Sequence, residues 1–193
     1  MIFGRKKNPE LDKFSDLLEM AVIGLYKERG NIVFTNTQKE KKLIIEYEGK
    51  IRANGMEKFD NEPTYVSAVN FFTNQQEMEK KKALGALIVY VKEEYLPILM
   101  KRLQYPPIDD ENPDAMLDSC GTLCNIVAGR FKSEITAAGY IELEWSHFLN
   151  YRNSAVLGIS FCPSEYDMYE LCFDIDGKKS FVVDMTMGVV PKR

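Results

Sequence analysis

The residues best able to do chemistry gather on one predicted helix, in the segment DSCGTLCNIVAGRFK. At about 100° per residue, one stripe roughly 80° wide carries a carboxylate, a hydroxyl, an amide, a glycine and an ammonium group: Asp118, Thr122, Asn125, Gly129 and Lys132. The Asn125 amide can both donate and accept hydrogen bonds, and Gly129 would let another backbone or a partner protein approach closely. These groups could orient a reacting molecule or dock a partner.

Asparagine and glycine are poor helix-interior residues, and together they cost on the order of 1.5 kcal/mol relative to alanine. A function at this stripe would compensate for that cost. The alternative is a solvated helix face with an accidental asparagine, and spacing alone does not decide between the two.

The helix that positions the stripe is predicted to start at Asn112 or Asp114, which can cap it, and to run to about Ala138, where Gly139 ends it. Its opposite side is apolar and is predicted to face the core: Met116, Cys120, Leu123, Cys124, Val127 and Phe131.

The rest of the chain alternates helical and strand patterns. An amphipathic helix is expected from Pro9 to about Glu28, closed by Gly30, and a shorter helix over 93–103. Strands are expected over 31–37, 41–53, 64–74, 83–91, 140–146, 155–163, 169–175 and 181–190. This order predicts an α+β sandwich, one layer of mostly antiparallel sheet with long helices packed on one face, in a single domain over 1–193.

Composition excludes several classes of partner. The chain has 193 residues and a formal net charge of -4, which argues against a nucleic acid. Its longest apolar run, around Ala86 to Val91, is far shorter than the roughly 20 residues of a membrane span. The amino terminus lacks a secretory signal pattern, so we expect no membrane and a cytoplasmic location.

Four cysteines, Cys120, Cys124, Cys162 and Cys172, fall in apolar segments and are predicted to be buried thiols rather than disulfides. Because the only histidine is His147, no metal site and no cofactor of the chain's own are expected. No glycine-rich phosphate loop or nucleophilic serine motif is present.

The segment DSCGTLCNIVAGRFKSEI followed by TAAGYIELEWS resembles the signature helix of the CheX branch of the CheC/CheX/FliY chemotaxis phosphatases. That motif runs Asp or Ser, three residues, Glu, two residues, Asn, then a hydrophobic pair and Ala-Gly before a lysine. The resemblance is strongest over residues 80–190, where KKALGALIVYVKEEYLPILMKRL resembles the family's strand and following helix.

The resemblance implies a cytoplasmic α+β protein, often a homodimer, that docks on the phosphorylated response regulator CheY. In the family, the helix asparagine positions a water in line with the aspartyl phosphate, and the glutamate holds the regulator's lysine. The Mg²⁺ comes with the regulator. Positioning and electrostatics supply the rate of such a reaction.

Carried over to this chain, Asp118 matches the first motif position, Asn125 the water-orienting asparagine, and Gly129 the close-approach glycine, with Lys132 beside it on the docking face. Thr122 stands where the family has glutamate. The CheC branch also has a proline further along, where this chain has 146–148, SHF. Losing one member of an acid-plus-amide pair costs several kcal/mol of transition-state stabilisation.

Three interpretations follow from the stripe and its missing glutamate. The first is a response-regulator phosphatase in which Asp118 or Thr122 serves as an imperfect second group beside Asn125. The second is a catalytically impaired module that binds the regulator without hydrolysis. The third is a scaffold that only dimerises, through strand pairing or an apolar surface near Phe71 and Phe72.

Overall fold

The computed structural model describes residues 8–29, 34–146 and 149–193. The predictions for Gly30 and His147 lie outside these residues. The helices are α1 (Leu11–Arg29), α2 (Gly55–Lys58), α3 (Gln75–Glu79), α4 (Leu96–Arg102) and α5 (Pro113–Ala137), with a 3₁₀ turn at Glu93–Tyr95. The strands are β1 (Asn36–Leu43), β2 (Glu46–Tyr47), β3 (Lys50–Asn54), β4 (Thr64–Phe72), β5 (Gly85–Lys92), β6 (Glu144–Trp145), β7 (Leu149–Arg152), β8 (Ala155–Ile159), β9 (Asp167–Ile175) and β10 (Lys178–Met187).

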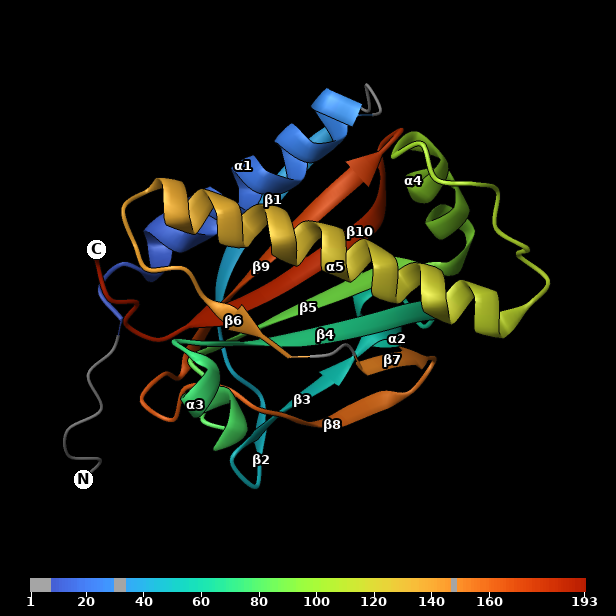
Figure 1. The fold of residues 1–193 in the computed structure, drawn as a ribbon. Helices are drawn as coiled ribbons and strands as arrows, with labels where there is room; N and C mark the ends of the chain where they lie inside the picture. The colour runs from blue at the N-terminus through green and yellow to red at the C-terminus, as the bar shows by residue number, and fades with distance from the viewer. Residues whose placement is uncertain (1–7, 30–33, 147–148) are drawn as a thin grey trace.

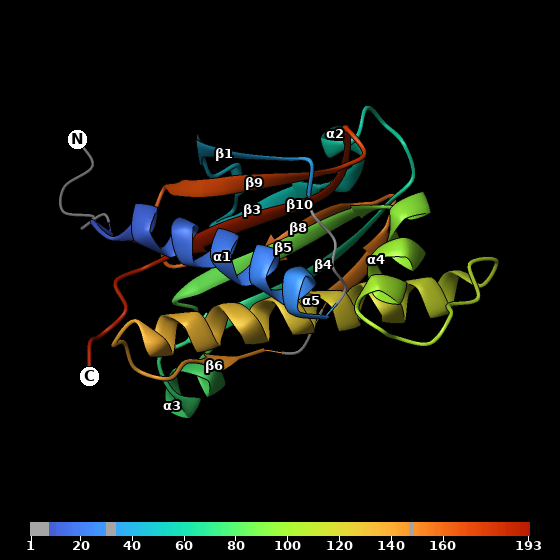
Figure 2. The ribbon, with the colours of Figure 1, turned by 90° about the horizontal axis from the view of Figure 1, so that it is seen from above.

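A seven-stranded antiparallel sheet forms the centre, in the order β1-β9-β10-β5-β4-β6, with β7 also paired to β4. Helices α1 and α5 lie side by side along one face of this sheet (Figures 1 and 2). The α+β class, the mostly antiparallel sheet and the long helices on one face are therefore confirmed.

Strand β5 is covered on both faces of the sheet. Its first seven residues, GALIVYV, are apolar without alternation, which is typical of a strand buried on both sides. Leu87, Val89 and Val91 point into the core beneath the helices, whereas Ile88 and Tyr90 point into a second core on the other face.

A small second sheet, in the order β2-β3-β8, covers this face, and β3 and β8 build the second core together with Phe59, which follows α2. The prediction of a single layer of sheet was therefore incomplete. The long strand expected over 41–53 is divided between β1, β2 and β3. Glu48 and Gly49 adopt positive φ in the tight turn that joins β2 to β3 and send the chain back on itself.

Two predicted strands differ from the structure. Residues 31–33 of the strand expected over 31–37 lie outside the described part of the chain, and the strand found after them is Asn36–Leu43, where a polar sequence pairs with β9 along its whole length at the sheet edge. The strand expected over 140–146 is reduced to Glu144–Trp145, and β7 was not predicted. Edge strands lack the apolar alternation that identifies a half-buried strand, because their side chains remain in water.

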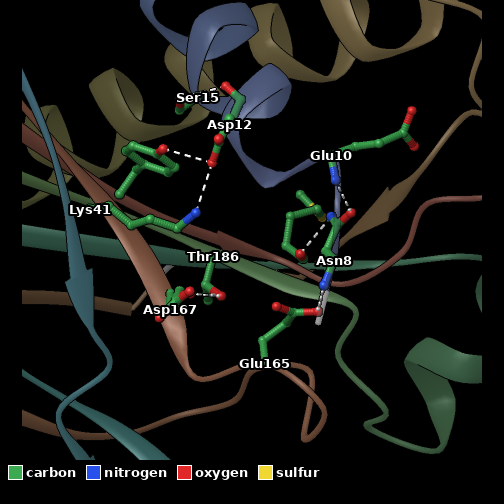
Figure 3. A network of polar contacts seen from close by, with 10 residues as sticks. Asn8, Glu10, Asp12, Ser15, Lys41, Glu165, Asp167 and Thr186 are labelled. Carbon is green, nitrogen blue, oxygen red and sulfur yellow. Dashed lines mark hydrogen bonds and ion pairs between the residues drawn. The ribbon is translucent and has the colours of Figure 1, made fainter. Parts of the chain in front are cut away.

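The start of α1 is tied to the sheet by a network of polar contacts (Figure 3). The buried Asn8 amide donates to the carbonyls of Met187 and Gly188, each at 2.9 Å, and its oxygen accepts from the Glu10 N–H as a helix cap. The Asn8 N–H donates to the buried Glu165 carboxylate at 2.8 Å. These bonds fix where α1 begins, and so how it lies beside α5.

Candidate functional site

Helix α5 starts as the sequence predicted. Asn112 is the N-cap, and its side chain accepts from the backbone N–H groups of Asp114 and Ala115, with Pro113 in the first turn. The six apolar residues predicted to face the core are all at most 1% exposed. The Cys124 thiol contacts the carbonyl of Ser67 on β4 at 3.6 Å, and Phe131 packs edge-on against Phe71.

Burial also explains the thiols on this face. It raises the pKa of Cys124 to about 12 and that of Cys120 well above its usual value, so neither is a nucleophile. All four cysteines are free, as predicted, although Cys162 is only half-buried. Among the described residues, no three His, Cys, Asp or Glu side chains gather into a group that could hold a metal ion.

The polar stripe lies on the opposite side of α5, where Asp118 and Asn125 are exposed and Thr122 is half-buried. The Thr122 hydroxyl donates to the Asp118 carbonyl at 3.0 Å. That proton is therefore engaged by the helix backbone, and Thr122 has no charge with which to replace a glutamate.

Asn125 and Asp118 differ from Thr122, whose hydroxyl is bonded to the helix backbone. The Asn125 amide makes no hydrogen bond with any residue that the structure describes, and the Asp118 carboxylate forms no ion pair with one. An exposed amide on a helix has both a donor and an acceptor free for a group brought from outside.

Gly129 is approached within the chain by Trp145 of β6. A Cβ atom at Gly129 would lie 3.2 Å from Cη2 of the Trp145 ring. The Lys132 ammonium group lies 5.1 Å from the centre of the same ring and 3.0 Å from a Glu142 carboxylate oxygen, which lowers the pKa of Glu142. The docking roles of Gly129 and Lys132 stay predictions, since both residues also hold β6 against α5.

Sequence reasoning missed a second close contact on the same helix. A Cβ at Gly121 would lie 2.7 Å from Nδ2 of Asn150 on β7, whose Oδ1 accepts from the Ser67 hydroxyl. The signal was present, because Gly121 is a second helix-interior glycine eight residues before Gly129. Both glycines allow the strands at this sheet edge to pack on α5.

On its other flank the stripe borders a shallow cavity of about 270 Å³. Ser119 and Thr122 line it from α5, and the proline-containing segment 105–109 lines it from the loop before the helix. The Asn125 amide and the Asp118 carboxylate lie outside this cavity, on the exposed convex surface of the helix. A small free substrate would find few contacts there, so the arrangement suits a reacting group carried by a large partner.

Apolar residues near Phe71 and Phe72, considered above as a dimerisation surface, do not form one. Phe71 is fully buried and Phe72 is 5% exposed, because β4 is covered by α5 and flanked by β6. A scaffold role would need another surface.

No protein-family model and no curated protein matches the sequence. Solved structures match it over nearly their full length. A CheC-like superfamily protein from Shewanella sp. PV-4 superposes with a TM-score of 0.57 at 12% identity, covering 89% of this chain and 95% of that one. Chemotaxis protein CheX from Vibrio vulnificus gives a TM-score of 0.56 at 12% identity, covering 90% and 97%.

This chain has the CheC/CheX fold. A third structure with this fold is a CheX–CheY–BeF₃–Mg²⁺ complex from Borrelia burgdorferi, at a TM-score of 0.51 and 12% identity, covering 91% of this chain and 98% of the other. The fold implied by the sequence resemblance is thus confirmed at an identity where a sequence comparison alone finds no match. None of the helices described here is both long and apolar enough to cross a membrane.

Proposed function

We propose that this chain is a CheX-like signalling protein of the cytoplasm whose α5 face docks on a phosphorylated, CheY-like response regulator. The observation that carries the proposal is the exposed Asn125 amide, free of hydrogen bonds to the described residues, two turns after Asp118 on the long helix of a CheC/CheX fold. A CheX protein with this fold forms a complex with CheY, BeF₃ and Mg²⁺.

In the proposed reaction, the regulator brings the aspartyl phosphate and its Mg²⁺, and this chain contributes no cofactor. Asn125 accepts a hydrogen bond from a water and holds it in line with the phosphorus atom. Asp118, one turn before Thr122, is the only carboxylate of the stripe and would pair with a cationic group of the regulator.

The charge around α5 supports a partner with cationic groups. From Gln104 to Gly129 the sequence carries five acidic residues and no basic one: Asp109, Asp110, Glu111, Asp114 and Asp118. All five are exposed. A surface of this kind attracts a basic patch and repels an acidic one.

A second candidate function is regulator binding without hydrolysis. The observation that favours it is the Thr122 hydroxyl, which is turned back to the helix backbone and leaves no carboxylate one turn before Asn125. The chain would then recognise the phosphorylated regulator and leave the phosphate in place.

We also propose a homodimer, which light scattering on the purified protein would detect as twice the mass of the chain.

The test is the decay of acetyl-phosphate-loaded response regulators with and without this protein, together with their binding by interferometry. A phosphatase accelerates the decay, and Asn125→Ala abolishes the acceleration while binding is retained. Ser133→Ala is the matched control, because Ser133 is an exposed polar residue two turns further along α5. It leaves the rate of regulator dephosphorylation unchanged. Binding without acceleration identifies the second candidate, and absence of binding by any regulator contradicts both.

A further inference from the structure

The shallow cavity beside Thr122 has walls from three segments. Helix α5 contributes Ala115, Ser119 and Thr122. The end of α4 contributes Met100, and the loop between the two helices contributes residues 105–109. Figure 1 shows this loop running from α4 to the first turn of α5. The cavity adjoins the proposed docking face, because Thr122 belongs to both.

Most of this lining is apolar. The loop presents an aromatic ring, two prolines and an aliphatic side chain: Tyr105, Pro106, Pro107 and Ile108. The two hydroxyl groups of the α5 wall are already engaged, since Ser119 donates to the Ala115 carbonyl at 2.8 Å and Thr122 donates to the helix backbone. Neither hydroxyl has a proton to offer a ligand, so contact with the cavity is chiefly apolar.

The loop that closes the cavity is held in place. The Tyr105 N–H donates to the Met100 carbonyl at 3.1 Å, and the Asp109 carboxylate accepts from the Glu111 N–H at 3.2 Å. The two prolines between these bonds have a fixed φ. A cavity whose walls are already fixed loses little conformational entropy when it is filled, which favours binding.

The size of the cavity favours a side chain over a free molecule. Its volume of about 270 Å³ is just below the roughly 300 Å³ of the smallest ordinary ligand sites. An apolar side chain of a docked protein needs no more space than this, and the rest of its interface supplies the remaining contacts. Size and lining therefore indicate one anchoring side chain.

Exposed carboxylates surround the cavity. Asp109 is the only charged residue of the described lining, and Asp110 and Glu111 follow it in the loop. Asp114 and Asp118 each directly precede a residue of the α5 wall. A partner that fills the cavity must bring its neighbouring residues close to these five carboxylates, which favours lysine and arginine there.

The basic residues closest in sequence belong to α4. Lys101 and Arg102 follow Met100, but neither lines the cavity. Even with both counted, the stretch from Met100 to Asp118 contains five acidic residues against two basic ones. The charge around the cavity therefore stays negative.

We propose that this cavity takes a large apolar side chain from the docked partner, on a segment that carries lysine or arginine beside it. The inference rests on the proposed function for the identity of that partner, a CheY-like response regulator. It supplies what the polar stripe lacks, because the exposed Asn125 amide and Asp118 carboxylate offer little apolar area to bury.

The direct test uses a peptide probe, acetyl-Lys-Phe-Lys-amide. Its counterparts are acetyl-Lys-Ala-Lys-amide, which lacks the ring, and acetyl-Glu-Phe-Glu-amide, which has the opposite charge. NMR of the backbone amide groups follows each titration. We expect saturable binding of the first peptide with a Kd of about 1–10 mM, shifts confined to residues around the cavity, and at least about fivefold weaker binding of the other two.

Ser119→Phe fills the cavity from α5, so it is expected to abolish binding of the probe and to weaken regulator binding at least about tenfold. Ser133→Phe is the matched control, because the Ser133 hydroxyl also donates to the helix backbone and the residue is exposed outside the cavity. Ile108→Asn, on the loop, is expected to weaken binding of both probe and regulator. Thermal unfolding checks that each variant is folded.

Failure of the probe to saturate, equal binding of either counterpart peptide, or equal effects of Ser119→Phe and Ser133→Phe would overturn the proposal. Regulator binding that Ser119→Phe leaves intact overturns the anchoring role while the proposed function stands. Binding of the probe at the cavity without binding of any regulator supports the cavity as an anchoring site and contradicts the proposed function alone.

Discussion

Thr122 is the residue that decides between the two proposed functions, because it stands where the resembling motif has a glutamate and its hydroxyl donates to the helix backbone. Glutamate is a good helix former, and its repulsion with Asp118 four residues away costs only about 0.2–0.5 kcal/mol. The position can therefore accept the family's residue without disturbing α5.

We predict that Thr122→Glu raises the rate of regulator dephosphorylation about 10- to 100-fold, because a second charged group then acts beside Asn125. The rate is measured on acetyl-phosphate-loaded regulator, with Ser133→Glu as the control for an added charge on the same helix. An unchanged rate with intact binding would show that the α5 face is a docking surface alone.

At the scale of elements, β7 packs closely on α5 because Gly121 has no side chain. A Cβ at Gly121 would meet the Asn150 amide at 2.7 Å, and Asn150 is held in place by Ser67. We predict that Gly121→Ala lowers the free energy of unfolding by about 1–3 kcal/mol, since the Asn150 side chain must move away from its hydrogen bond with Ser67.

The effect of Gly121→Ala on the free energy of unfolding should change sign when the Asn150 side chain is removed. In an Asn150→Ala background, Gly121→Ala is expected to stabilise the protein by up to about 1 kcal/mol, which is the helix propensity gained. Urea unfolding of the four chains measures the coupling. Equal effects of Gly121→Ala in both backgrounds would contradict the steric explanation.

A buried ionic cluster joins α2 to β9 and β10: Lys58 contacts both Glu170 and Asp184, and Lys42 also contacts Glu170. This cluster makes the free energy of unfolding depend on pH. Burial raises the pKa of Glu170, but hydrogen bonds from Lys42 and Lys58 outweigh it and bring the pKa to about 2, from an ordinary 4.5. A carboxylate with a lower pKa in the folded chain stabilises the fold above its unfolded pKa. This contribution is lost as the pH falls from about 4.5 to about 2.

We predict that Glu170→Gln lowers the free energy of unfolding at pH 7 by about 3 kcal/mol, because Lys58 and Lys42 lose their shared partner. The difference from the wild-type chain should shrink between pH 4.5 and pH 2, since protonation then removes the same charge from the wild type. Urea unfolding across this pH range measures it. Glu46→Gln, on the exposed β2, serves as the control; a difference independent of pH would contradict the prediction.

At the scale of the whole molecule, the acidic residues from Asp109 to Asp118, before and along α5, make the electrostatic potential at this end of the protein negative. We predict that association with a response regulator slows as salt is added, and that Asp109→Asn/Asp110→Asn/Glu111→Gln slows it about tenfold at low salt. Glu46→Gln/Glu48→Gln, on the β2–β3 hairpin, is the control. Association rates with the same salt dependence in both variants would rule out this steering.

Much of α5 and of its site could be predicted from the sequence. The Asn112 cap, the buried apolar face and the exposed positions of Asp118 and Asn125 all follow from helical periodicity. The motif resemblance predicted the fold, which the solved structures confirm. These features depend on residues a few positions apart, so the local sequence contains the information that fixes them.

Other features depend on contacts between residues that are far apart in the sequence. The ring beside Gly129 comes from Trp145, sixteen positions later, and Lys58 is bridged to Glu170 and Asp184, more than a hundred positions away. The sequence predicted strands over 41–53 and 155–163, but it has no local signal for the pairing of β3 with β8 or of the charged β1 with β9, because those partners are distant in the chain. The sequence by itself determined which side of α5 faces water. Only the tertiary structure decided what lies beside that face and which charges are buried behind the sheet, because burial and pairing are properties of contacts between elements.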